Sequence, residues 1–182
     1  MSQPTIVSRS ILWKGHGHSV EKVSLQVHGG DIHEQVISKH LPGAVIVAVN
    51  SKNEVVLLQK YRMAVNQTLI ELPAGKIEAT ETAISGAQRE LLEEVGLTAS
   101  RWSDLGSTYG AQGSSDWMCH YFLAEDIADS VSGMNPHETH TFFWLPLTEC
   151  WEQVLDGRIC NNFSIVGLAK ALSHLKYSFH TN

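Results

Sequence analysis

The stretch from residue 75 to residue 97 constrains the fold most, because its apolar residues follow the period of an α-helix. The residues that would form the buried face are Ile84, Ala87, Leu91 and Val95. Thr80 or Thr82 can accept a hydrogen bond from the N–H groups at the helix start, and Gly96 suits the left-handed residue that closes a helix. The sequence therefore predicts an amphipathic helix that packs on a core and ends at Gly96.

One face of this helix carries carboxylates that stability alone does not explain. Glu90 and Glu94 lie one turn apart, roughly 40° from each other around the helix axis, and Glu93 lies beside them, turned further toward solvent. Ionised carboxylates on one face repel one another, and only Arg89 offers a positive charge beside them. A hard divalent cation would neutralise the cluster, because Mg²⁺ and Mn²⁺ prefer oxygen ligands.

The same stretch resembles the Nudix box, G-x5-E-x7-R-E-U-x-E-E-x-G-U, in which U is an aliphatic residue. The match holds at nine fixed positions: Gly75, Glu81, Arg89, Glu90, Leu91, Glu93, Glu94, Gly96 and Leu97. A solvated acidic helix that ends at a glycine is the alternative, and it leaves this fixed spacing unexplained. The resemblance implies an α/β fold, namely an α/β/α sandwich with a mixed sheet. It also implies hydrolysis of a nucleoside diphosphate linked to another moiety, with Mg²⁺ or Mn²⁺ as cofactor.

The resemblance also suggests roles for individual residues. Glu90 and Glu94 would bind the metal, with Glu93 as a further ligand or a neighbour of one, and the backbone carbonyl of Ala74 would be another ligand. Arg89 would orient a glutamate rather than touch substrate.

Two candidates remain open for the general base that activates water. One is Glu138, which precedes a strand-like run from residue 139 to residue 147, and the other is a glutamate of the helix such as Glu93. An ordinary loop carboxylate is the alternative for Glu138, because a base must be judged first by its geometry.

Two stretches before the helix resemble the ADP-ribose and nucleotide-sugar branch of the family: residues 59–62 (QKYR) and residues 71–75 (ELPAG). By this resemblance Arg62 would hold phosphate, for which its planar guanidinium is suited, although a surface ion pair is the alternative. Glu71 ends an apolar run, so we expect it either to form a pocket wall or to pair with Arg62.

The loop from residue 110 to residue 116 (GAQGSSD) is glycine-rich, polar and long enough to contact a ligand, which makes Gln112, Gly113 and Ser115 candidate substrate contacts. ADP-ribose pyrophosphatases usually carry a proline here, and this chain does not. We therefore expect ADP-ribose as the leading substrate, giving AMP and ribose 5-phosphate, with tolerance for other nucleoside diphosphate sugars. GDP-mannose or another nucleotide is the alternative substrate, and a non-catalytic nucleotide-sugar-binding module is a further one.

Residues 1–41 read as a small antiparallel β unit, and residues 42–182 as the Nudix hydrolase domain. The first segment is too small to hold a core alone, so it must pack on another surface. It could cover its own domain, but the resemblance implies an exchange of strands across a homodimer. Trp13 could then stack on the nucleotide, or it could be buried in packing.

The rest of the main domain reads as alternating strands and helices. Residues 44–49 are almost wholly apolar, as in a central strand, and residues 54–61 follow a turn as the expected hairpin partner. Further strands are expected at residues 102–109, 117–124 and 139–147, with a mobile-looking segment over 126–140. Helices are expected at residues 147–155 and from a cap at Asn162 or Ser164 to Leu175.

Composition limits the partners. The net charge of −6 argues against broad binding to nucleic acid, and no apolar run approaches the length of a membrane span. The odd count of three cysteines argues against a disulfide framework, and the first residues lack the apolar core of a signal peptide. We expect a cytoplasmic enzyme with a small-molecule substrate.

Overall fold

The computed structural model describes residues 3–27, 29–130, 135 and 140–176. The backbone forms two compact units. One comprises Met1–Pro42 with Thr108–Met118, and the other comprises Gly43–Ser107 with Cys119–Asn182.

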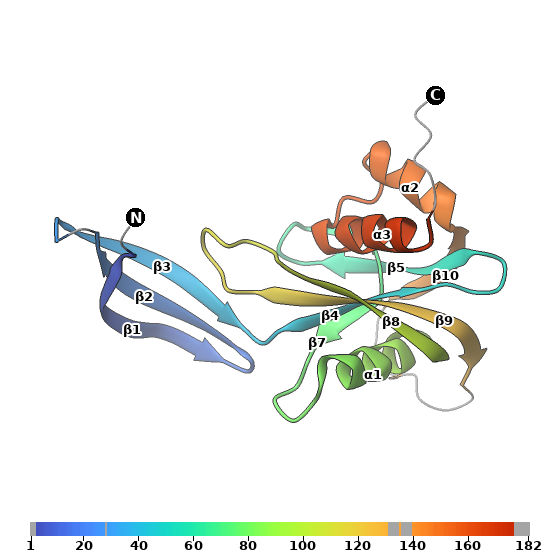
Figure 1. The fold of residues 1–182 in the computed structure, drawn as a ribbon, viewed down its shortest axis with the longest axis horizontal. Coiled ribbons are helices and arrows are strands. Elements are labelled where there is room, and N and C mark those ends of the chain that lie inside the picture. The colour runs from blue at the N-terminus through green and yellow to red at the C-terminus, as the bar shows by residue number, and fades with distance from the viewer. Residues whose placement is uncertain (1–2, 28, 131–134, 136–139, 177–182) are drawn as a thin grey trace. The chain divides into compact units, whose positions relative to one another are not determined.

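The first unit contains a three-stranded sheet in the order β1-β2-β3, which confirms the predicted small antiparallel β unit (Figure 1). Its strands are β1 (Thr5–Gly15), β2 (His18–Gln26) and β3 (Ile32–His40). The β1–β2 turn contains Gly17 at φ 64°, a left-handed conformation that glycine adopts without steric cost. The segment Thr108–Met118 joins this unit through a bridge between Ser38 and Ser115.

The second unit contains two sheets. The four-stranded sheet has the order β7-β4-β9-β8, and it is mixed because β4 pairs antiparallel with β7 and parallel with β9. Its strands are β4 (Gly43–Ala48), β7 (Ala74–Lys76), β8 (Leu97–Tyr109) and β9 (Met118–Asp129). The three-stranded sheet has the order β10-β5-β6 and is antiparallel. Its strands are β5 (Glu54–Arg62), β6 (Gln67–Glu71) and β10 (Thr141–Pro146).

Helices cover both sides of this unit, which confirms the predicted α/β class with a mixed sheet. The helix α1 (Ala83–Val95) lies on one side, and α2 (Leu147–Leu155) and α3 (Asn162–His174) lie on the other (Figure 1). Thr82 begins α1, because its side chain accepts from the backbone N–H of Ser85 while Ser85 bonds back to Thr82. Gly96 ends α1 at φ 66°, as the sequence predicts.

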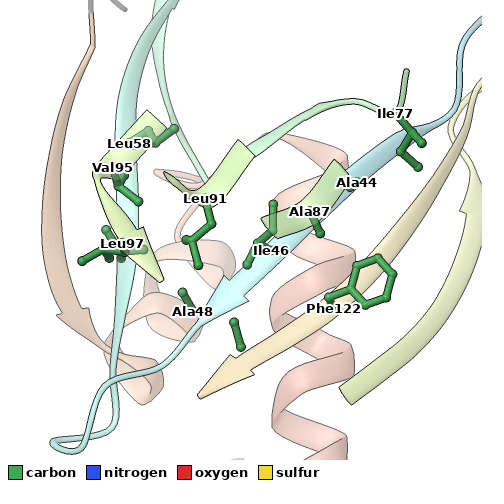
Figure 2. Packing of buried hydrophobic residues seen from close by; sticks show 12 residues of the cluster. Ala44, Ile46, Ala48, Leu58, Ile77, Ala87, Leu91, Val95, Leu97 and Phe122 are labelled. Carbon is green, nitrogen blue, oxygen red and sulfur yellow. The ribbon is translucent and has the colours of Figure 1, made fainter. Parts of the chain in front are cut away.

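The apolar stripe of α1 is buried against the four-stranded sheet. Figure 2 shows Leu91 and Ala87 of α1 beside Ile46 of β4, with Phe122 of β9 nearby, and Leu91 is fully buried. All residues of β4 are buried because α1 and α3 both pack on this strand. Burying one leucine side chain contributes about 2 kcal/mol to folding, so this stripe fixes which face of α1 points away from the core.

The predicted hairpin between residues 44–49 and 54–61 is wrong. Both edges of β4 are occupied by β7 and β9, and β5 pairs with β10 and β6, so a single bridge between Val49 and Val55 links the two strands. The turn itself exists, because the Asn50 side chain accepts from the backbone N–H groups of Lys52 and Glu54. The strand after a tight turn can join either sheet, and the pairing of β5 with β6 and β10 places it in the three-stranded sheet.

Several predicted boundaries also differ from the structure. The strand expected at residues 102–109 begins at Leu97, and part of the segment expected to be mobile over 126–140 belongs to β9, which runs to Asp129. The sequence does not predict the short strands β6 and β7. The last helix is capped by Asn161 rather than by Asn162 or Ser164. In the described part of the chain, no helix is both long and apolar enough to span a membrane.

Candidate active site

Three carboxylates of α1 lie beside or opposite the apolar stripe, with Glu94 next to the stripe and Glu93 farthest from it. The side chains of Glu90 and Glu94 are only 14% and 2% exposed, whereas that of Glu93 is 38% exposed. Glu93 is thus turned further toward solvent, as the helical spacing predicts. Two buried negative charges one helical turn apart need positive partners, because an uncompensated buried charge is very costly.

Arg89 supplies the first of these partners. One terminal nitrogen of its guanidinium donates to Glu90 at 2.8 Å and to Glu93 at 2.9 Å, and its Nε donates to Glu81 at 2.8 Å. The other terminal nitrogen donates to the backbone carbonyl of Lys76 at 2.7 Å. Arg89 therefore ties the acidic face of α1 to the loop that precedes the helix.

The hydrogen bond between Arg89 and Glu81 shifts the pKa values of both side chains. The Arg89 hydrogen bond, with help from the Glu78 backbone N–H, lowers the pKa of Glu81 from 4.5 to about 2. The pKa of Arg89 is raised, chiefly by its hydrogen bond to Glu81. Both residues therefore stay charged at neutral pH, and their hydrogen bond holds the Arg89 guanidinium in place beside Glu90 and Glu93.

Glu94 is held from two other elements. Its Oε1 accepts from the Nζ of Lys60 on β5 at 2.6 Å, and its Oε2 accepts from the backbone N–H of Ala74 on β7 at 2.8 Å. Burial raises the pKa of Glu94, and the neighbouring Lys60 opposes that rise. Lys60 is not among the site residues predicted from the sequence. A signal was present, because Lys60 lies two residues before Arg62, on the same face of a strand.

Gly75 lets the backbone of β7 pass close to Glu90. A Cβ atom at position 75 would overlap the Glu90 carboxylate, so a side chain here would push that carboxylate away. Burial is also the main cause of the raised pKa of Glu90. The residues 73–75 thus form a backbone lip against the acidic face of α1.

The donor set fits a hard divalent cation by its chemistry. The candidate ligands are the carboxylate oxygens of Glu90, Glu93 and Glu94 and the backbone carbonyl of Ala74, and Mg²⁺ prefers such oxygen ligands. Among the described residues, no three His, Cys, Asp or Glu side chains form a ready-made cation site. In this structure Lys60 bonds the Glu94 carboxylate and Arg89 bonds the Glu90 carboxylate.

The structure brings Arg62 and Glu71 together on neighbouring strands. The Arg62 guanidinium donates to both Glu71 oxygens, with the Nε contact at 2.9 Å. The Glu71 side chain is 3% exposed and that of Arg62 is 42% exposed. Of the two expectations for Glu71, the partner of Arg62 is the one observed. The ion pair fixes the guanidinium plane while leaving part of it exposed to solvent.

The remaining substrate candidates lie in the first unit. Trp13 is 54% exposed, and its ring contacts His18 edge-on with centroids 5.4 Å apart. In the loop, the carbonyl of Gly113 accepts from the Gln35 side chain, and Ser115 Oγ accepts from the backbone N–H of Trp117 at 3.1 Å. Gln112 is exposed. Trp13 is thus not buried in the packing of this unit.

The candidate base Glu138 lies outside the described residues. The nearest described residues on either side both bond to the C-terminal part of α1. The backbone N–H of Asn135 donates to the Glu93 carbonyl at 2.9 Å, and His140 Nε2 bonds to the Glu94 carbonyl at 2.8 Å.

Comparison with known proteins gives a family-model match and several relatives. The model described as NUDIX domain matches residues 39–159. The chain is 32% identical over 165 residues to an ADP-ribose pyrophosphatase of Mycobacterium tuberculosis (strain ATCC 25618 / H37Rv), covering 89% of this chain and 80% of that protein. It is 36% identical over 110 residues to an ADP-ribose pyrophosphatase of Bacillus subtilis (strain 168), covering 60% and 58%.

One further relative and one solved structure match nearly the whole chain. A methanol dehydrogenase activator of Bacillus methanolicus is 26% identical over 171 residues, covering 90% of this chain and 92% of that protein. A solved structure described as an ADP compounds hydrolase superposes with a TM-score of 0.86 over 97% of this chain and 96% of that one, at 20% identity. At that identity the likeness shows the fold.

Proposed function

The chain belongs to the Nudix family of hydrolases, and from this premise we propose that it hydrolyses the diphosphate bond of nucleoside diphosphate sugars. ADP-ribose is the leading substrate, with AMP and ribose 5-phosphate as products. The observation that carries the proposal is the pair of carboxylates, the buried Glu94 and the largely buried Glu90, held against the backbone lip at residues 73–75. The two bacterial relatives named ADP-ribose pyrophosphatases favour this substrate over other nucleotides.

Mg²⁺ or Mn²⁺ is the proposed cofactor. Glu90 and Glu94 would hold it together with Glu93 and the carbonyl of Ala74. When bound, the ion would stabilise the charge on the diphosphate and lower the pKa of the attacking water. The burial of Glu90 and Glu94 supports the assignment, because two partly desolvated carboxylates gain more from a bound cation than exposed ones do.

Protein side chains would perform the remaining steps. Arg89 orients Glu90 and Glu93, since it is braced by Glu81 and bonds both carboxylates. Arg62 presents its exposed edge to a phosphate while Glu71 fixes its plane. Glu138 or Glu93 would take the proton from water.

The first unit would bind the nucleotide and form a homodimer. Its strands β1 and β3 expose large apolar side chains, which supports a second copy of the chain as their cover. These residues are Ile6, Val7, Ile11, Leu12, Ile32 and Val36. Light scattering should then give about twice the 20.1 kDa mass of one chain.

Trp13 would stack on the base, and Gln112, Gly113 and Ser115 would contact the distal sugar. The polar side chain of Gln112 is exposed, and this loop has no proline. Both features favour tolerance for several nucleoside diphosphate sugars. A cytoplasmic location completes the proposal, and it is supported by the free thiols Cys119, Cys150 and Cys160, which suit a reducing compartment.

The test is hydrolysis of a panel of nucleoside diphosphate sugars with Mg²⁺, followed by phosphatase and phosphate detection. GDP-mannose and a dinucleoside polyphosphate belong in the panel. ADP-ribose should be cleaved fastest, and Glu90→Gln and Glu94→Gln should each lose most turnover while remaining folded by circular dichroism. Glu152→Gln, an exposed glutamate of α2, is the control and should keep full activity. Full activity in both site variants would refute the metal assignment.

A further inference from the structure

The partly buried ion pair between Lys60 and Glu94 joins two elements far apart in sequence. The two charged atoms are 2.6 Å apart, and the side chains of Lys60 and Glu94 are 23% and 2% exposed. The second oxygen of Glu94 accepts from the Ala74 backbone N–H. Both oxygens of this carboxylate therefore accept from donors of the protein itself, and one of the donors carries a full positive charge.

Lys60 and Arg89 hold their carboxylates in different ways. Arg89 bonds Glu81 and the Lys76 carbonyl as well as Glu90, so its position is fixed independently of the acidic cluster. Lys60 carries a compact point charge on a flexible four-carbon stem. Its three donors rotate freely, so the attraction to a carboxylate does not depend on one fixed geometry, whereas the planar fork of a guanidinium does.

We propose that Lys60 is a positioning residue that acts as an internal counter-ion of Glu94 and competes with the divalent cation for this carboxylate. The inference rests on the proposed function, because it presupposes that Glu94 binds the cation. Before a cation binds, Lys60 compensates the buried charge and holds the Glu94 side chain in place. When a cation binds, the ammonium must leave Oε1 or remain beside a second positive charge, and either change weakens cation binding.

The expected size of the effect follows from Coulomb's law. Even at the dielectric constant of water, an ammonium about 6 Å from a divalent cation weakens its binding about tenfold, so tenfold is the smallest effect expected at this partly buried pair. The test measures Mn²⁺ binding to the full-length protein by isothermal titration calorimetry. Lys60→Gln keeps a hydrogen-bond donor but removes the charge, and its Mn²⁺ dissociation constant should fall at least about tenfold. Lys60→Arg keeps the charge and should stay within about twofold of wild type.

Lys52→Gln is the matched control, because Lys52 is an exposed lysine in the turn before β5, where its backbone N–H donates to the Asn50 side chain. This variant also loses one positive charge from the second unit. If its Mn²⁺ dissociation constant is unchanged, the change in net charge alone does not explain the tighter binding by Lys60→Gln. A second measurement needs no variant at all. In a Mg²⁺ titration of the wild type followed by NMR, the Lys60 ammonium signal should shift and that of Lys52 should not.

The outcomes separate the inference from the proposed function. If the wild type binds Mn²⁺ and hydrolyses ADP-ribose, but Lys60→Gln binds Mn²⁺ equally or more weakly, the inference is overturned and the function stands. A raised KM for ADP-ribose with an unchanged Mn²⁺ constant also overturns it, because Lys60 would then contact substrate. If the wild type neither binds Mn²⁺ nor hydrolyses any substrate of the panel, the proposed function and the inference fail together.

Discussion

Replacing Gly75 by alanine tests whether the backbone lip places the Glu90 carboxylate. A Cβ atom at this position would overlap the end of the Glu90 side chain. Because a carboxylate is the far end of a flexible side chain, it can turn aside, so we expect a loss of stability of only about 1 kcal/mol. For a chain of 182 residues this loss corresponds to a fall in Tm of about 2–4 °C.

The effect on catalysis should be much larger. Glu90 must leave its bond to Arg89 and its place beside the lip, and a displacement of about 1 Å in an active site can cost about 100-fold in rate. We therefore expect kcat/KM for ADP-ribose to fall about 100-fold, which is about 2.7 kcal/mol of transition-state stabilisation. The assays are thermal unfolding by circular dichroism, Mn²⁺ binding by calorimetry and steady-state hydrolysis.

Gly157→Ala provides a control with a comparable loss of stability at a distant turn. Gly157 has φ 82°, and an added Cβ there would have no neighbouring atom within 4 Å, so alanine is strained by its backbone alone, at about 1 kcal/mol. This variant should keep wild-type activity. If Gly75→Ala retains both its Mn²⁺ affinity and its kcat/KM, the lip does not position Glu90 for catalysis and the reasoning is wrong.

Three further predictions concern the scaffold around the site. Leu91→Ala should lower the free energy of unfolding by about 3 kcal/mol in urea titrations, because Leu91 is fully buried, and a loss below about 1 kcal/mol would contradict the packing described. Ser164→Ala should cost about 1–3 kcal/mol in the same assay, since it leaves the buried N–H of Leu72 without its 2.9 Å acceptor; an unchanged stability would show that this bond contributes nothing. Glu81→Gln should lower Tm near neutral pH, and the difference in Tm from wild type should shrink as pH falls from 4.5 toward 2. A carboxyl group whose pKa is lowered by folding stabilises the fold at pH values above its ordinary pKa, and it loses that effect as it is protonated. A pH-independent difference would exclude the charged bond to Arg89 as its cause.

The helix that carries the candidate site was predictable because its signals are local. Thr82 and Gly96 mark its ends through contacts within one turn, and the buried stripe follows from a period that can be counted along the chain. The placement of Glu90 and Glu94 together beside the buried stripe follows from the same period. A helix specifies which side chains share a face without reference to the rest of the fold.

The partners of these carboxylates were not predictable in the same way. Lys60 and Ala74 lie 34 and 20 residues from Glu94, on β5 and β7, and only the pairing of strands brings them to α1. That pairing was also the source of the error about β4 and β5, because an apolar run and a polar turn do not encode which sheet the next strand joins. The lip strand β7 has three residues, too few to show an alternating pattern.

The contacts around Glu90 and Glu94 show how the fold compensates the charges on the acidic face of α1. Repulsion between the carboxylates would oppose helix formation, and burial would add a desolvation cost for each charge. Arg89 offsets this cost for Glu90 from within the helix, and Lys60 offsets it for Glu94 from a neighbouring strand. The protein thus supplies a positive counter-charge for each of these two carboxylates, one from a neighbouring strand and one from the same helix.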